Sequence, residues 1–221
     1  MSSSGGFPLD LVLFGMIAAF LVLRLRSILG RRTGFERPAS PQSLAEGGTV
    51  IEGHAEPVTA PPAPTRGFPP PDSPAAQTLA QMRGIDRGFD PMAFLIGAEG
   101  AFRLIVTAYA KGDRATLAPL LGPETRQVFE AAISAREAAG ETLETEIKAL
   151  LAATITDAAL AGTRASITVR FVSDQVSLTR GPNGEIVHGN EAVTEITDLW
   201  VFERDLTSAD PTWRLAAAQS H

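Results

Sequence analysis

The stretch GFDPMAFLIGAEGAFRLIVTAYAKGD, from Gly88 to Asp113, decides the fold of the distal part of the chain. Asp90 followed by Pro91 predicts a helix start, because a carboxylate accepts hydrogen bonds from the free amides of the first turn and proline is tolerated there. Gly112 predicts the end of the helix. Apolar side chains recur at helical spacing between these points, at Phe94, Leu95, Ala98, Phe102, Ile105, Val106 and Tyr109. An apolar face of this width predicts a sheet beneath the helix.

The residues after this helix predict two more helices and then strands. The helices are expected from Arg114 to Leu121 and from about Pro123 to Ala139, and the second turns Val128, Phe129 and Ile133 inward. Alternating β-branched and polar residues predict strands from Ala165 to Leu178, from Ala192 to Leu206 and, shorter, from Thr212 to Ala218. The turn sequence GPNGE, Gly181 to Glu185, joins the first two of these strands into a long hairpin.

The segment from Leu143 to Leu160 fits a helix face as well as one side of a strand, through Leu143, Ile147, Leu151 and Ile155. Its short link to the next strand, Ala161 to Thr163, favours a hairpin. Helices followed by a run of antiparallel strands predict an α+β domain, residues 85–221, in which the helices cover one face of the sheet.

A proline-rich linker, residues 38–84, is expected before this domain. Ten of the sixteen prolines lie between Pro38 and Pro74, among Gly, Ser, Ala and Thr. Such a composition predicts a disordered, extended spacer. Only the piece from Pro74 to Met82 is weakly amphipathic, with Leu79 and Met82 on one side.

The first 37 residues predict a membrane anchor with a basic segment after it. The run LVLFGMIAAFLVL, Leu11 to Leu23, has thirteen residues and no charge, against the about 20 that a spanning helix needs. Arg24 and Arg26 can extend it by lying along the apolar core and reaching the headgroups. The expected bilayer-facing residues are Leu11, Phe14, Ile17, Phe20 and Leu23, and the expected headgroup-facing residues are Arg24, Arg26, Arg31 and Arg32.

Two alternatives to the anchor fit less well. A cleaved signal peptide carries its positive charge before the apolar run, and here the arginines follow it. A soluble core helix has a polar face, and Leu11 to Leu23 has none. Because positive charge stays on the cytoplasmic side, we expect a single-pass protein of the inner (plasma) membrane with its C-terminal domain in the cytoplasm.

Charge and composition narrow the function classes. The net charge is −6, and residues 85–221 carry 12 Lys and Arg against 19 Asp and Glu, a balance of −7. An acidic domain is a poor match for nucleic acid. The chain has no cysteine, and His54, His188 and His221 have no ligand partners at metal-binding spacing, so neither a metal nor a cofactor is expected. The oligomeric state is left open.

Several stretches together resemble the Tim44-like family and its bacterial TimA-type adaptors. They are RLRSILGRRTG after the anchor, FDPMAFLIGAEGAFRLIVTAYAKGDRATLAPLLGPE, ITVRFVSDQ, TDLWVFERD and DPTWRLAA. The resemblance implies helices on the concave side of a curved four-stranded antiparallel sheet, similar to nuclear-transport-factor-two and cystatin-like folds, with an apolar pocket between the layers. It also implies a scaffold role at an inner membrane. The mitochondrial relatives recruit an Hsp70 motor through an N-terminal region that the spacer here does not match.

One carboxylate invites a chemical interpretation. By strand alternation Asp198 shares a face with Ile196, Trp200 and Phe202, so we expect it at the rim of the apolar pocket. The expected pocket residues are Phe94, Phe102, Ile105, Phe171, Asp198, Trp200 and Phe202. A carboxylate desolvated beside an indole could act as an acid or base. The structural alternative is a bond from Asp198 to a backbone amide or to Arg170 or Arg204.

Two functions follow from these observations. The first is a membrane-anchored adaptor without catalytic residues, which binds protein partners or acyl chains at the inner membrane and is related to protein translocation or membrane-protein assembly. The alternative is a small-molecule enzyme or binding protein that uses the pocket, with Asp198 as acid or base. A protein-binding surface should carry exposed apolar residues near Phe89 or Phe94 rather than a sealed cavity.

Overall fold

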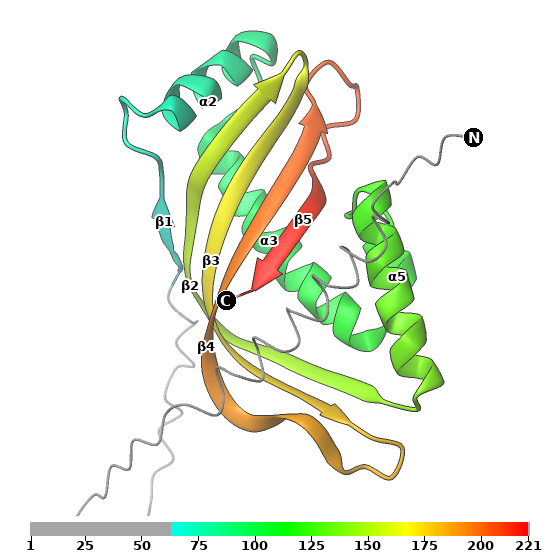
Figure 1. Ribbon diagram of the computed structural model, residues 1–221. Coiled ribbons are helices and arrows are strands. Elements are labelled where there is room, and N and C mark those ends of the chain that lie inside the picture. The colour runs from blue at the N-terminus through cyan, green and yellow to red at the C-terminus, as the bar shows by residue number, and fades with distance from the viewer. Residues whose placement is uncertain (1–62, 221) are drawn as a thin grey trace, which may run out of the picture. The chain divides into compact units, whose positions relative to one another are not determined.

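The computed structural model describes residues 63–220 of this chain. The expected anchor, the headgroup-facing arginines and the first part of the linker lie outside the described residues. The described part forms an α+β domain with its own hydrophobic core, which we describe by itself (Figure 1).

The helices are α2 (Pro74–Ile85), α3 (Pro91–Lys111), α4 (Arg114–Leu117) and α5 (Pro123–Ala138). The helix capped by Asp90 and the one expected from about Pro123 to Ala139 begin and end within about one residue of the predicted positions. The helix expected from Arg114 to Leu121 ends at Leu117, because residues 118–120 form a turn and Leu121 pairs with Leu215. The predicted cap of α3 is confirmed, because Asp90 Oδ1 accepts a hydrogen bond from the Met92 amide at 2.7 Å. Gly112 ends α3 with φ +69°, a left-handed conformation that favours glycine.

The sheet has five strands, so the prediction of four was wrong. The strands are β1 (Thr65–Gly67), β2 (Thr142–Ala161), β3 (Arg164–Arg180), β4 (Ile186–Asp205) and β5 (Arg214–Ser220), and they lie side by side in chain order. The pairs from β2 to β5 are antiparallel, as expected, whereas β1 pairs with β2 in parallel, which makes the sheet mixed. The ambiguous segment 143–160 is a strand within β2.

Residues 65–84, which were predicted to belong to the linker, are part of the folded unit. Strand β1 lies against Ala152–Thr154 of β2, and Leu79 and Met82 of α2 are buried. This order could not be predicted from the proline-rich composition. Strand β1 has only three paired residues, and both β1 and α2 are stabilised by contacts with the distant strand β2 rather than by a local sequence pattern.

Figure 1 shows a strongly bent sheet with α3 lying across one of its faces. The three register shifts between β2 and β3, near Ile147, Leu150 and Ile155, are β-bulges of the kind that increase strand bending. Helix α5 is fastened to the edge strand β5, since the Gly122 amide donates to the Leu215 carbonyl at 2.8 Å and the Thr125 hydroxyl donates to the Ala216 carbonyl. The core therefore sits between α3 and the sheet.

Helix α3 is long and apolar enough to cross a membrane by length and composition alone. Its buried residues, however, pack on the sheet as a core helix does: Phe94, Leu95, Ala98, Glu99, Phe102, Ile105, Ala108 and Ala110. The buried side of α3 is therefore apolar because it forms part of the core. The core does not account for the apolar residues on the exposed side of α3.

Candidate functional site

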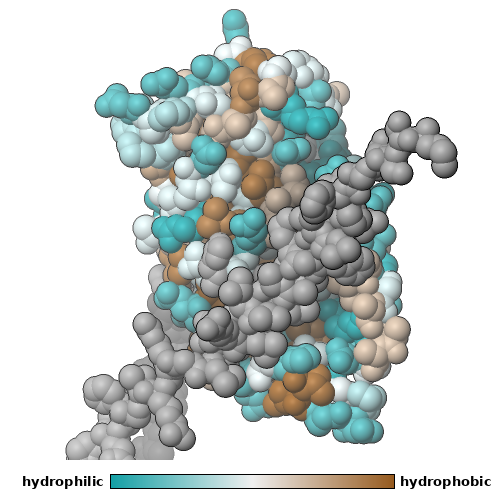
Figure 2. All heavy atoms as spheres, viewed as in Figure 1, coloured by the Kyte–Doolittle hydropathy of each residue, from teal (hydrophilic) through white to brown (hydrophobic). Residues whose placement is uncertain are grey.

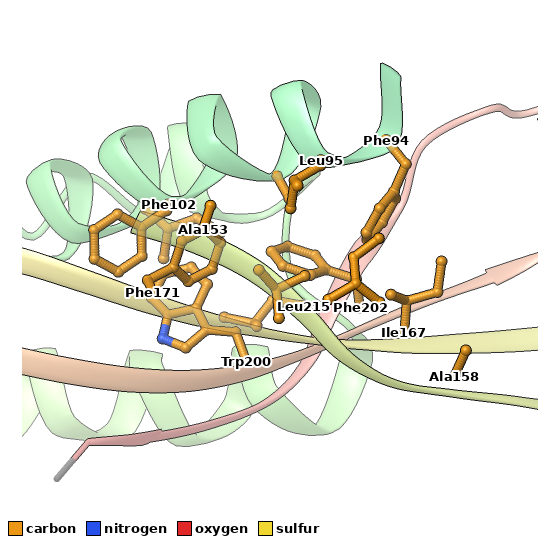
Figure 3. Close-up of a cluster of buried hydrophobic side chains, with 14 of the residues drawn as sticks. Phe94, Leu95, Phe102, Ala153, Ala158, Ile167, Phe171, Trp200, Phe202 and Leu215 are labelled. Atoms are coloured by element: carbon orange, nitrogen blue, oxygen red, sulfur yellow. The ribbon is translucent and has the colours of Figure 1, made fainter. Parts of the chain in front are cut away.

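The side chains predicted to line a pocket form the packed core instead. Figure 3 shows Phe94, Leu95 and Phe102 pointing from α3 toward Phe171, Trp200 and Phe202 of the sheet. The rings of Phe102 and Phe171 are stacked with centroids 4.5 Å apart, and Trp200 lies 4.9 Å from Phe102. Ile105 is 1% exposed and belongs to the same cluster. Large aromatic side chains from both layers thus occupy the space that the prediction left for a ligand.

The seventh predicted residue, Asp198, is buried on the same face of β4 as Trp200 and Phe202, as alternation predicted. Its Oδ1 accepts a hydrogen bond from the Ser220 hydroxyl of β5, a partner that sequence reasoning did not consider. Arg204, one of the expected partners, instead bonds to Asp86 at 2.9 Å. The arrangement supports the structural interpretation, in which Asp198 links the two last strands.

Two further buried polar residues lie on this face and were missed. Ser173 and Gln175 of β3 are 0% and 5% exposed, and the Gln175 side-chain amide donates to the Ser173 hydroxyl at 2.8 Å. Strand alternation from Phe171 could have found them, because residues 171, 173 and 175 share one face.

A buried ion pair fixes β1 to α3. The Arg66 guanidinium donates twice to the Glu99 carboxylate, at 2.6 and 2.8 Å, and the Glu99 side chain is only 9% exposed. This bidentate bond raises the pKa of Arg66 and keeps it charged. Gly67 approaches β2 so closely that a Cβ atom there would lie 2.6 Å from the Thr154 hydroxyl. The chain therefore enters the domain along a fixed path.

Immediately after β1, residues Phe68–Pro70 form a strap that stands off the body of the domain. One hollow, about 400 Å³, lies between the strap, the start of α2 and residues 154–157 of β2. A second, about 230 Å³, lies between the strap, α2 and Pro91. Both are open to solvent and mainly apolar, and Phe68 itself is 42% exposed. The strap and the lining residues of α2 lie in residues 38–84, which were predicted to be linker, so the sequence did not predict this site.

Exposed apolar side chains gather near this site and along α3. Phe68, Ile85, Met92, Ile96 and Leu104 are each at least 42% exposed. On the face shown in Figure 2, apolar patches are small and separated by hydrophilic residues, and one lies at the lower end of the sheet beyond β5. Met92 and Ile96 lie next to Phe94 along the chain, where the adaptor prediction expects exposed apolar residues near Phe89 or Phe94.

The two hollows are lined by few ionisable side chains. Asp157 is the only ionisable residue lining the larger hollow, and Arg83 the only one lining the smaller. Within residues 63–220, no group of three His, Asp or Glu side chains is placed to hold a metal ion. Apolar walls of proline and phenylalanine with few polar groups suit an apolar side chain of a partner.

These observations define an α+β domain with an aromatic core between helix and sheet and with open, mainly apolar hollows on its surface. A family model described as the Tim44-like domain matches residues 75–220, and the chain belongs to that family. The resemblance stated from the sequence is therefore confirmed. A search of curated proteins gives no match.

Solved structures resemble the domain more remotely. The intermembrane-space region of the chloroplast protein ARC6 is 11% identical, with a TM-score of 0.41, over 57% of this chain and 95% of that one. A putative dehydratase of the NTF2-like family from Streptomyces avermitilis is 14% identical, with a TM-score of 0.35, over 59% and 96%. An NTF2-like protein from Cytophaga hutchinsonii is 13% identical, with a TM-score of 0.33, over 60% and 98%.

Proposed function

We propose that this chain is a membrane-anchored adaptor that binds a protein partner at the inner membrane through the strap and its two hollows. The observation that carries the proposal is the contrast between a filled interior and an open, apolar strap. Aromatic rings occupy the space between α3 and the sheet, whereas Phe68 stands exposed between two hollows. A partner could therefore bury apolar surface at the strap, whereas the apolar rings between α3 and the sheet already bury one another.

The position of the strap supports an adaptor role. The strap follows β1, and the Arg66–Glu99 pair holds β1 against α3, so the strap has a fixed place on the domain. A partner bound at the strap would be held close to the point where the linker leaves the domain. The apolar run Leu11–Leu23 followed by arginines favours an inner-membrane location with this domain in the cytoplasm. Membership of the Tim44-like family supports the proposal of a role in protein translocation or membrane-protein assembly.

The proposal includes no catalytic step. Asp198 is the one carboxylate for which acid or base chemistry is conceivable, and its Oδ1 already accepts from Ser220. The variant Asp198→Asn keeps the shape of the side chain and removes its acid–base function. An adaptor keeps its partner in this variant. Loss of a measurable turnover with the fold intact would instead establish the alternative, an enzyme that uses Asp198.

Site-specific photo-crosslinking tests the adaptor proposal. The full chain carries a photoreactive phenylalanine analogue at position 68 or, as a control, at Val193, which is 55% exposed on β4. We expect a discrete protein adduct from position 68 in intact membranes and none from position 193. A chain without residues 1–37 should give less of this adduct. Equal labelling from both positions, or adducts with lipid alone, would contradict a protein-binding strap, and undiminished labelling without residues 1–37 would show that anchoring does not select the partner.

Protease treatment of right-side-out membrane vesicles tests the expected orientation. A domain in the cytoplasm is protected until the vesicles are opened. Digestion of the domain from outside would contradict the proposed location and leave the strap proposal to be judged by crosslinking.

A further inference from the structure

The outer face of α3 is apolar although no described element covers it. Ile96 is 50% exposed, Leu104 47% and Met92 42%, and Gly97 and Gly100 between them have open space where a Cβ atom would lie. The exposed positions of α3 that share the face of Gly100 and lie within two turns of it are 93, 96, 97, 103, 104 and 107. Arg103 is the only charged residue among these six, and Lys111 lies on the same face in the last turn. In a domain with a balance of −7, a face without acidic residues stands out as a binding surface.

We propose that this outer face of α3 binds the same face of a second copy of this chain, with the two helices antiparallel and a two-fold axis near Gly100. The exposed positions are arranged symmetrically about that residue. An antiparallel pair places Ile96 opposite Leu104 of the other copy, and position 93 opposite position 107. It also places Gly97 opposite Arg103, so that the smallest residue faces the longest side chain. Such self-complementarity is what a two-fold interface requires.

The charges at the two ends of α3 select the antiparallel arrangement. Asp90 precedes the first turn, and Lys111 lies in the last turn on the Gly100 face, about three turns away. Lys111 has no ion-pair partner within 4 Å in the described part of the chain. An antiparallel pair brings each Lys111 toward Asp90 of the other copy, whereas a parallel pair would set like charges together. Charge complementarity therefore favours a second copy in one orientation.

The size of the face determines how strong the association is. A helix of 21 residues is about 31 Å long, so a single helix pair buries less area than a standard stable interface. We expect weak self-association of the domain, which rises steeply with local concentration. Gly97 and Gly100 let the helix backbones approach closely, which increases the contact area available to the neighbouring apolar side chains.

Cysteine crosslinking tests the orientation, because the natural chain has no cysteine. The variants are Gly100→Cys, Ile96→Cys and Leu104→Cys in the full chain, treated with a short bifunctional maleimide. We expect Gly100→Cys to crosslink with itself, and a mixture of Ile96→Cys with Leu104→Cys to crosslink more than either variant alone. The control is Ala131→Cys at an exposed position of α5. Equal yields from α5 and α3, or self-crosslinking of Ile96→Cys above the mixture, would overturn the proposal.

A charge placed in the centre of the face tests whether the face causes the association. The variant Leu104→Glu should weaken self-association of the full chain by about tenfold or more, measured by light scattering after gel filtration. The matched control Val193→Glu, at the 55% exposed position on β4, should leave it unchanged. Circular dichroism verifies that both variants fold. A full chain that is monomeric at every concentration, or one whose association survives Leu104→Glu, for example through the expected anchor, rules the interface out.

Discussion

The two faces of α3 differ in what explains their apolar residues. The inner face carries Phe94, Leu95 and Phe102, which are 7% exposed or less and contact the sheet. The outer face carries Ile96 and Leu104, which are about half exposed. The fold requires the inner residues, because their side chains bury the apolar face of the sheet. The fold does not require the outer residues, and they belong to the surface that we propose binds a second copy of the chain.

This difference shows why composition alone misleads for such a helix. Averaged around its circumference, α3 is apolar enough for a membrane span. When its two faces are considered separately, one face of α3 is buried in the core. The other face has two glycines and a few separated apolar residues. A helix in lipid needs no such division, since lipid surrounds it on all sides.

The largest expected difference between the two faces is in the free energy of unfolding that is lost when a side chain on each face is truncated to alanine. We expect Phe102→Ala to lower the free energy of unfolding by about 3–5 kcal/mol, because the Phe102 side chain is fully buried and its ring stacks on Phe171. Leu104→Ala, two positions away, should change it by less than about 0.5 kcal/mol. Urea denaturation of the unit from Pro62 to His221, at concentrations too low for self-association, measures both. Similar losses would show that the outer face is also part of the fold.

The sequence predicted the inner face of α3 well, because its signals are local. Asp90 and Gly112 mark the ends of the helix, and the spacing from Phe94 to Ile105 marks its buried side. The ring of Trp213, just before β5, contacts the ring of Phe94 with centroids 4.8 Å apart and so joins the start of the last strand to this face of α3.

The features that sequence reasoning missed depend on contacts between distant residues. Strand β1 is a three-residue piece that pairs with residues 152–154, and no periodicity can be read from three residues. The pocket prediction failed for a related reason. Alternation shows that Phe171 and Trp200 face the helix, but it does not show that Phe102 fills the space between them.

The inner face of α3 also carries a charge, and its removal should loosen β1. In Glu99→Gln the Arg66 guanidinium loses its charged partner, so we expect the amides of β1 to exchange with deuterium about tenfold faster or more. The matched control is Glu137→Gln, which breaks the exposed Arg114–Glu137 pair at 2.8 Å, and exchange in β1 should not change. Unchanged exchange of β1 in Glu99→Gln would mean that Gly67 and the strand pairing suffice to hold β1.

On the outer face, a substitution that fills open space should stabilise the monomer slightly. A Cβ atom at Gly97 meets nothing within 4 Å, so Gly97→Ala should raise the free energy of unfolding by up to about 1 kcal/mol through helix propensity. The same change should weaken self-association, since Gly97 faces Arg103 of the other copy in the proposed pair. Thermal unfolding and light scattering measure the two effects. A gain in both would remove the reason to place Gly97 in an interface.

The smallest expected effect is on the pKa of Asp113, which lies just after the C-terminal end of α3. Hydrogen bonds from the Thr116 side chain and then its backbone, with a weaker contribution from Lys111, hold the pKa of Asp113 below its ordinary value of 3.8. A depressed pKa in the folded state stabilises the fold above pH 3.8, and this stabilisation is lost as the pH falls through the folded pKa. Carboxyl NMR titration should therefore show a larger rise in the pKa of Asp113 in Thr116→Val than in Lys111→Gln. The reverse order would mean that the charge of Lys111 is directed toward Asp113 rather than toward Asp90 of a second copy, and would weaken the argument for an antiparallel pair.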